Sequence, residues 1–285
     1  MPPIIYGTAW KKERTAELTF LAIKHGFRAI DTAAMKLHYH EAGVGQAINR
    51  ALKLGIVTRK DLWIQTKYTP NDEPYASDPS TPTIASQIQA SVASSLRNLF
   101  PDPTLPDSDR YLDALILHAP YPNHHHTLQA WDAFLPLVPH TTRCLGVSNA
   151  PLQILRLLTA SPIPPAIVQN RVRTLPRERD VDVRRFCRAS GIRYQGFWTL
   201  TANDEWKTAP AVTEVARRAG VASAVVWYAL LGEVAGVTVL NGTSRENRMK
   251  ADLEGLEVLG PWKETEEGRG PWGEAVAWAV GLMGV

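Results

Sequence analysis

Four side chains that could together move a proton to a carbonyl group occupy matching places in this sequence. Asp31, Lys67 and His118 each close a short apolar, strand-like run, and Tyr39 lies in the connection after the first run. If these runs are parallel strands of one barrel, their C-terminal ends meet on the face where such barrels build active sites. We therefore predict that the four side chains share one site.

The combination of these residue types is typical of a proton-donating device. Reduction of an aldehyde or ketone needs a hydride donor and an acid that protonates the forming alkoxide. A free phenol, with a pKa of about 10, is a reluctant acid at neutral pH. The ammonium of Lys67, held by Asp31, would lower the pKa of Tyr39 and make it a better donor. His118 would hydrogen-bond the carbonyl oxygen and polarise it. We predict carbonyl reduction.

Each residue also has an ordinary structural explanation. Asp31 could cap a helix, and Lys67 could be a surface residue at a strand end. Tyr39 could be a half-buried aromatic and His118 a core histidine with its hydrogen bonds made. Their joint placement at the same end of consecutive strands favours the catalytic interpretation.

The elements that must position these residues alternate apolar runs with longer helical patterns, which indicates βαβ units and a parallel sheet. Strands are expected at residues 4–7, 28–31, 62–67, 112–118, 143–147, 166–169, 192–196 and 236–240. Helices are expected at 13–25, 41–54, 83–99, 127–137, 151–159 and 181–190, with Pro151 in a first turn, and loops at 68–82 and 101–109. We predict an α/β fold, a single (β/α)8 TIM barrel over residues 1–285. No Gly-x-Gly-x-x-Gly follows an early strand, which argues against a Rossmann domain.

The composition sets limits on partners and location. The 285 residues are 45% hydrophobic and 21% charged, which is ordinary globular usage. The net charge of +3 is small and the basic residues are dispersed, so no nucleic-acid partner is expected. We find no secretory signal and no apolar run near the roughly 18 residues of a membrane span. With Cys144 and Cys187 expected to be reduced, we predict a cytoplasmic protein, a monomer or weak homo-oligomer, whose partner is a small carbonyl compound.

Several segments resemble the aldo-keto reductase family across nearly the full chain. They are residues 27–33 (FRAIDTA), 64–67 (IQTK), 115–118 (LILH), 146–149 (GVSN), 168–170 (VQN) and 242–244 (GTS) with Arg248. The family is a (β/α)8 barrel that uses NAD(P)H without a metal. Its Asp-Tyr-Lys-His tetrad maps onto Asp31, Tyr39, Lys67 and His118.

The resemblance also implies a nicotinamide site. Ser148, Asn149 and Gln169 match positions that hold the nicotinamide carboxamide, and Thr8 is a further cofactor position. Phe197 stands where the family usually has a tyrosine that stacks on the nicotinamide ring, and phenylalanine keeps the π-face for stacking.

A second implied site would bind the adenosine phosphate of NADPH. Gly242, Thr243 and Ser244 lead into an expected helix, whose first N–H groups favour a phosphate. Thr243, Ser244 and Arg248 would hold the 2′-phosphate, and Arg248 would also stack on adenine. Asp252 stands where the family has an adenine contact. Without the tetrad, an ordinary capped helix start would explain this stretch.

The sequence departs from the family near its acid. The family usually places its tyrosine about five residues after the aspartate, within Tyr-x-Asn-Glu, whereas Tyr39 comes eight residues after Asp31 with no asparagine. Tyr39 is still the only tyrosine between the second and third expected strands. The N-terminal hairpin common in the family is missing.

Aromatic and apolar residues that follow the expected strands could line a substrate pocket. They are Trp10, Met35, Tyr68, Tyr121 and Trp198. Scattered core aromatics are the alternative. Three consecutive histidines, at 124–126, cannot easily face one ion, so no metal is predicted.

These patterns predict an NADPH-dependent oxidoreductase that reversibly reduces an aldehyde or ketone, with Tyr39 as the general acid. Two alternatives remain open. One is a barrel that binds NADPH as a sensor or partner subunit, and the other is a non-redox lyase or cyclase that reuses the tetrad.

Overall fold

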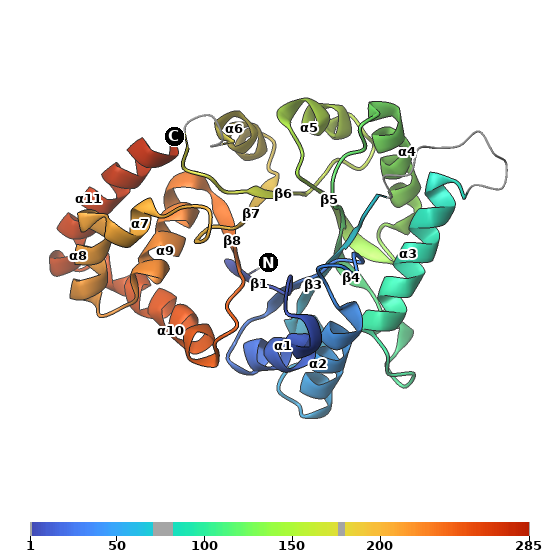
Figure 1. Ribbon diagram of the computed structural model, residues 1–285, viewed down its shortest axis with the longest axis horizontal. Coiled ribbons are helices and arrows are strands. Elements are labelled where there is room, and N and C mark those ends of the chain that lie inside the picture. Colours follow the sequence, from blue (N-terminus) through green and yellow to red (C-terminus); the bar gives the residue numbers. More distant parts are fainter. Residues whose placement is uncertain (1, 71–81, 176–179, 285) are drawn as a thin grey trace.

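The chain folds into a closed barrel of parallel strands in the computed structural model, which describes residues 2–70, 82–175 and 180–284. Neighbouring strands pair in sequence order, and β1 pairs with β8 to close the ring. Helices surround the strands (Figure 1), so the predicted (β/α)8 architecture is confirmed. The strands are β1 (Ile4–Gly7), β2 (Ala29–Asp31), β3 (Trp63–Tyr68), β4 (Leu112–Leu117), β5 (Thr142–Ser148), β6 (Ile167–Arg171), β7 (Arg193–Phe197) and β8 (Val237–Asn241).

The connections between strands and the chain after β8 together carry eleven α-helices and four short 3-10 turns within the described residues. The helices are α1 (Thr15–Lys24), α2 (Glu41–Lys53), α3 (Ile84–Leu99), α4 (His124–Phe134), α5 (Leu152–Thr159), α6 (Val181–Ala189), α7 (Glu205–Thr208), α8 (Pro210–Ala219), α9 (Ser223–Ala235), α10 (Glu246–Trp262) and α11 (Glu266–Met283). The turns are η1 (Lys12–Arg14), η2 (Arg59–Asp61), η3 (Asp107–Asp109) and η4 (Leu135–Leu137).

Three expected helices begin differently, and the one expected at 127–137 begins three residues earlier, as α4 at His124. The one expected at 13–25 is divided into η1 and α1, where the Thr15 hydroxyl donates to the Lys12 carbonyl at 2.6 Å. The one expected to include Pro151 begins at Leu152, because Pro151 is extended with ψ 159° and only precedes the first turn. Most of the loop expected at 68–82 lies outside the described residues, since 71–81 are not among them.

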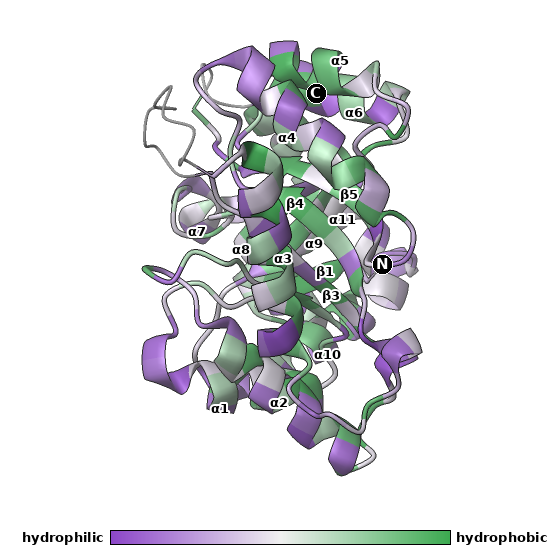
Figure 2. Ribbon diagram, turned by 90° about the vertical axis from the view of Figure 1, so that its right-hand side faces the viewer, coloured by the Kyte–Doolittle hydropathy of each residue, from purple (hydrophilic) through white to green (hydrophobic). Residues whose placement is uncertain are grey.

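Alternation along the strands sorts side chains between the barrel interior and the surrounding helices. The strands of the barrel are mostly hydrophobic, whereas the helices around them carry both hydrophobic and hydrophilic residues (Figure 2). Inside the barrel, Ala114, Ile116 and Ile167 form a small apolar cluster. A polar layer lies beside it, since Gln65 is paired with Ala114.

That polar layer consists of three glutamines around one carboxylate. Gln65 and Gln169 both donate through Nε2 to Asp31 Oδ1, at 2.7 and 2.9 Å, and both also donate to Gln195 Oε1. All four side chains are buried. Because buried polar groups need partners, this network fixes the position of Asp31.

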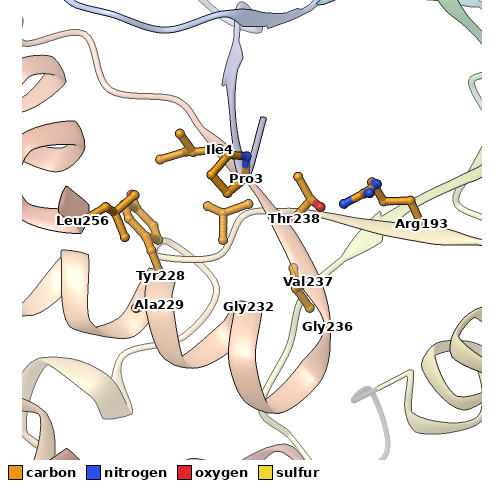
Figure 3. Close-up of a pocket in the computed structure, with 11 residues that line it drawn as sticks. Pro3, Ile4, Arg193, Tyr228, Ala229, Gly232, Gly236, Val237, Thr238 and Leu256 are labelled. Atoms are coloured by element: carbon orange, nitrogen blue, oxygen red, sulfur yellow. The ribbon is translucent and has the colours of Figure 1, made fainter. Parts of the chain in front are cut away.

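The far end of the barrel holds a separate cavity of about 440 Å³, lined by Pro3, Ile4, Arg193 and Thr238 among others (Figure 3). These residues belong to the N-terminal halves of their strands or precede them. The cavity therefore opens away from the strand ends that carry the predicted catalytic residues.

Two features concern the chain as a whole. Cys144 and Cys187 are both free thiols, as expected. No single helix among the described residues is long and apolar enough to cross a membrane. Only α8 and α9 taken together, with a bend of 112° between them, have the length and composition of such a span within these residues.

Candidate active site

A buried ion pair forms the base of the site. Lys67, in β3, places Nζ 2.7 Å from Asp31 Oδ2 at the end of β2, and both side chains are almost wholly inaccessible. The same ammonium donates to the Thr32 carbonyl at 2.8 Å. In the parallel pairing of β2 and β3, Asp31 lies opposite Gln65, and Lys67 is two residues further along β3 on the same face, from which its side chain reaches Asp31.

Tyr39 reaches this ion pair from the loop between β2 and α2. The loop is held by backbone hydrogen bonds from Tyr39 N to Met35 O and from Trp10 N to His38 O. Lys67 Nζ lies 4.9 Å from the centroid of the Tyr39 ring, and the ring of His118 lies edge-on to it with centroids 5.9 Å apart. The longer spacing from Asp31 thus still brings the tyrosine ring to the other three residues.

Burial decides the protonation of the tyrosine. It raises the pKa of Tyr39, and the nearby Lys67 cation lowers it by less. The expectation that the pKa falls is therefore wrong for the protein alone, although the effect of Lys67 has the expected sign. Burial would by itself lower the pKa of Lys67, but Asp31 and Tyr39 together raise it. Tyr39 is thus protonated and Lys67 charged at neutral pH.

His118 is neutral and held in one orientation. Burial, with the Lys67 charge, lowers the pKa of its imidazole to about 4. Its Nδ1 lies 2.7 Å from the hydroxyl oxygen of Thr69, and its carbonyl accepts from Asn149 Nδ2 at 2.9 Å. A neutral imidazole has one donor and one acceptor. If Thr69 donates to Nδ1, the ring carries its proton on Nε2.

Thr69 was not found from the sequence. It lies two residues after Lys67, so strand alternation would have placed it on the same inward face.

The residues expected near a nicotinamide ring gather around the same ion pair. The Ser148 hydroxyl donates to the Gln169 carbonyl at 2.7 Å and accepts from Asn149 Nδ2 at 3.2 Å. The buried Thr8 hydroxyl donates to the Asp31 carbonyl at 2.9 Å. Phe197 ends β7 and is half-buried. The amide nitrogen of Gln169 is already used by the polar layer, so its oxygen is the group left for a ligand.

The loop between β8 and α10 carries the residues expected to bind phosphate. The Thr243 carbonyl accepts from the Tyr6 hydroxyl at 3.0 Å, and the Gly242 carbonyl accepts from Lys11 Nζ. Ser244 and the exposed Arg248 lie on either side of the helix start. No side chain among the described residues caps the first turn of α10. This helix therefore begins with free N–H groups, a positive end that suits an anion.

Asp252 is placed differently from the expectation. It is buried and accepts from Asn241 Nδ2 at 2.7 Å, and burial raises its pKa. Its carboxylate thus fastens α10 to β8 rather than facing a ligand above the helix.

The five expected pocket residues divide into two groups. Trp10 and Trp198 are 59% and 47% exposed at the C-terminal end of the barrel, where Met35 is half-buried in the β2–α2 loop. Tyr68 and Tyr121 are only 4% and 5% exposed, with hydroxyl oxygens 2.9 Å apart.

Tyr68 does not belong to the pocket, because its neighbour Lys67 points into the barrel and Tyr68 must point out. Its ring packs edge-on against Phe134 of α4. Tyr121 lies in the same layer, between the strands and the helices. The prediction that Tyr68 and Tyr121 line the substrate pocket is therefore wrong. The histidines at 124–126 begin α4, and no group of three His, Cys, Asp or Glu in the described parts of the chain could hold a metal ion.

Comparison with known proteins agrees with this geometry. The model of the aldo/keto reductase family matches residues 3–264. An uncharacterised oxidoreductase of Bacillus subtilis, YtbE, is 28% identical over 80% of this chain and 73% of its own length. The NADP-dependent D-sorbitol-6-phosphate dehydrogenase of Malus domestica is 27% identical over 90% and 86%. The crystal structure of a Bombyx mori aldo-keto reductase in complex with NADP superposes with a TM-score of 0.74 and 20% identity, covering 98% of this chain and 89% of the other.

Proposed function

Since this chain belongs to the aldo/keto reductase family, we propose that it reduces an aldehyde or a ketone to the alcohol, with NADPH as the hydride donor. The observation that carries the proposal is the buried Lys67–Asp31 pair beside Tyr39, with neutral His118 across from the phenol ring. The reaction is reversible, and the same groups serve alcohol oxidation.

The described residues fit NADPH at two places. The half-buried face of Phe197 offers a surface for the nicotinamide ring, beside the polar groups of Ser148, Asn149 and Gln169. The uncapped start of α10, with Ser244 and Arg248 beside it, offers free N–H groups and a positive charge for the 2′-phosphate. When bound, NADPH supplies the hydride.

The chain's own residues supply the proton. The Tyr39 phenol donates its proton to the carbonyl oxygen, and the Lys67 ammonium stabilises the phenolate that remains. Asp31, held by the glutamine layer, keeps Lys67 charged and in place. Nε2–H of His118 hydrogen-bonds the carbonyl oxygen and orients it toward the acid.

The rim of the site supports a preference for aromatic or bulky apolar carbonyl compounds. The exposed indole rings of Trp10 and Trp198 offer flat apolar surfaces at the mouth. Equal turnover of small polar sugars and aromatic ketones would contradict this preference.

The decisive test compares Tyr39→Phe with the wild type, following consumption of NADPH against a panel of aromatic and aliphatic carbonyl compounds. Loss of the acid should lower kcat by about 10²- to 10⁴-fold, while the dissociation constant for NADPH changes little. Tyr111→Phe is the matched control, because Tyr111 is a buried tyrosine directly before β4, at the barrel's other end. It should keep wild-type turnover.

Other outcomes would favour different functions. Turnover that survives in Tyr39→Phe would show that another group donates the proton. NADPH binding without turnover of any carbonyl would favour a sensor or partner subunit. Conversion of a substrate with no change in cofactor absorbance would favour a lyase or cyclase.

A further inference from the structure

Arg171 points into the barrel mouth directly above the polar layer. Along β6, Ile167 packs in the interior cluster and Gln169 donates to Asp31, so these alternate residues face inward. Arg171 is the next residue on that face. Two residues of strand advance the chain by roughly 6.6 Å, which takes Arg171 from the level of Gln169 to the rim.

The guanidinium of Arg171 contacts aromatic rings and not a carboxylate. It lies 4.1 Å from the centroid of the Trp198 ring and 5.9 Å from that of Phe197. Arg171 is exposed, and within the described residues its side chain makes no hydrogen bond or ion pair. A guanidinium placed over an indole ring by a cation–π contact still has its N–H groups free, in the fork that matches a carboxylate.

The position of β6 separates Arg171 from the proposed phosphate site. In the closed barrel, β6 and β8 lie on opposite sides of β7. A cofactor with its nicotinamide on Phe197 and its 2′-phosphate at α10 would extend from β7 toward β8, away from Arg171. The free charge therefore faces the space left for the substrate.

We propose that Arg171, stacked on Trp198, is an anion subsite that selects aldehydes or ketones bearing a carboxylate. The proposal rests on the reductase function proposed above and names its substrate class. The apolar body of such a compound would lie against Trp198 and Trp10, while its carboxylate accepts two hydrogen bonds from the guanidinium.

A second arginine provides a matched control. Arg193 begins the neighbouring strand β7 and lines the cavity at the barrel's other end (Figure 3). Its side chain is exposed and likewise makes no ion pair within the part of the chain that the structure describes. Arg193→Gln therefore removes the same charge far from the mouth.

The experiment measures kcat/KM for 4-formylbenzoate and for its neutral methyl ester in the wild type, Arg171→Gln, Arg171→Lys and Arg193→Gln. Arg171→Gln should lower the ratio of the anionic to the neutral substrate by about tenfold or more, the effect of losing a charge-assisted hydrogen bond. The ratio for Arg171→Lys should lie between those of the wild type and Arg171→Gln, since lysine keeps the charge but lacks the forked donor geometry of arginine. Arg193→Gln should keep the wild-type ratio.

An unchanged ratio in Arg171→Gln would overturn the proposal. So would an equal loss for both substrates together with weaker NADPH binding, which would assign Arg171 to the cofactor. If the wild type reduces neither compound, nor any carbonyl compound of the panel above, the proposed reductase function fails. Calorimetric binding of 4-formylbenzoate to the NADP⁺-loaded protein still decides the subsite: binding that Arg171→Gln weakens supports it, and binding that it leaves unchanged rejects it.

Discussion

At the scale of single residues, the contact between Thr69 and His118 determines which imidazole nitrogen can serve a substrate. A hydroxyl that donates to Nδ1 leaves the proton on Nε2, the nitrogen that the proposed mechanism uses. Thr69→Val keeps the shape and removes the donor, so the Nδ1–H tautomer becomes accessible. We expect kcat to fall by about tenfold, roughly 1.4 kcal/mol, whereas Thr69→Ser should keep most of the activity.

The nitrogen chemical shifts of His118 report the tautomer independently of activity. They should indicate Nε2–H in the wild type and in Thr69→Ser, and a mixture in Thr69→Val. An unchanged Nε2–H signal in Thr69→Val would contradict the positioning role, even if kcat had fallen.

The pH dependence of reduction follows from the two shifted side chains. His118, with its pKa lowered to about 4, stays neutral throughout the physiological range. In the proposed mechanism Tyr39 is the acid, so activity is lost as pH rises through its pKa, which burial raises above the ordinary value of about 10. We therefore expect kcat/KM for carbonyl reduction to be flat from about pH 5.5 to pH 9.5 and to fall only above that.

A profile of kcat/KM against pH with a neutral substrate checks this expectation. A rise or a fall of kcat/KM centred near pH 6.5, the ordinary pKa of histidine, would show that His118 titrates there and is not held neutral.

At the scale of elements, the sequence was most informative where one face of a strand is buried. All eight strands lie within two residues of the ranges expected from apolar runs. Helix starts were less certain, because Pro151 is compatible with both the residue before a helix and its first turn. The side on which Tyr68 and Tyr121 lie was missed, because following a strand does not say which way a ring points.

The glutamine layer shows a different limit. Gln65, Gln169 and Gln195 occupy three separate strands, and only the closed barrel brings their amides to Asp31. No local pattern in the sequence indicates such long-range partners. The raised pKa of Tyr39 was missed for the same reason, since burial depends on how the β2–α2 loop folds back.

The packing of α2 against α3 depends on one glycine. A Cβ added to Gly45 would overlap the carbonyl oxygen and backbone of Asn98 at the end of α3. Gly45→Ala should therefore push the two helices apart and lower the free energy of unfolding by about 2 kcal/mol. Gly273→Ala is the control, because Gly273 lies in α11 with nothing within 4 Å of its added Cβ.

In a denaturant titration, Gly273→Ala should be neutral or stabilise the protein by up to about 1 kcal/mol, as alanine favours a helix over glycine. Equal effects of the two substitutions would show that α2 and α3 tolerate the extra methyl group, and that the close approach is not a constraint.

At the scale of the whole molecule, the two ends of the barrel have separate tasks. The C-terminal end carries the proposed chemistry, and the N-terminal end carries a second buried ion pair. Arg59 donates to Asp113 Oδ2 at 2.9 Å, and the same oxygen accepts from Ile64 N at 2.8 Å. The guanidinium also stacks on Tyr111, 3.8 Å from its ring centroid. The pair therefore joins the segment before β3 to β4 at the base of the barrel.

Asp113→Asn tests whether the Arg59–Asp113 ion pair affects stability alone. It leaves the buried Arg59 charge without its counter-ion, so the free energy of unfolding should fall by about 3 to 5 kcal/mol. Asp113→Leu combined with Arg59→Met removes both charges and should recover much of that loss, since apolar side chains of similar volume replace the pair. Glu214→Gln breaks an exposed pair with Arg217 and should have little effect.

Each folded variant should reduce carbonyl compounds at the wild-type rate, because the Arg59–Asp113 pair and the tetrad lie at opposite ends of the barrel. Chemical denaturation and single-point kinetics on the folded fraction measure the two quantities separately. A kcat that falls in Asp113→Asn, and returns in the double variant, would show that the base of the barrel is coupled to Lys67 through β3, and that stability and chemistry are not divided between the two ends.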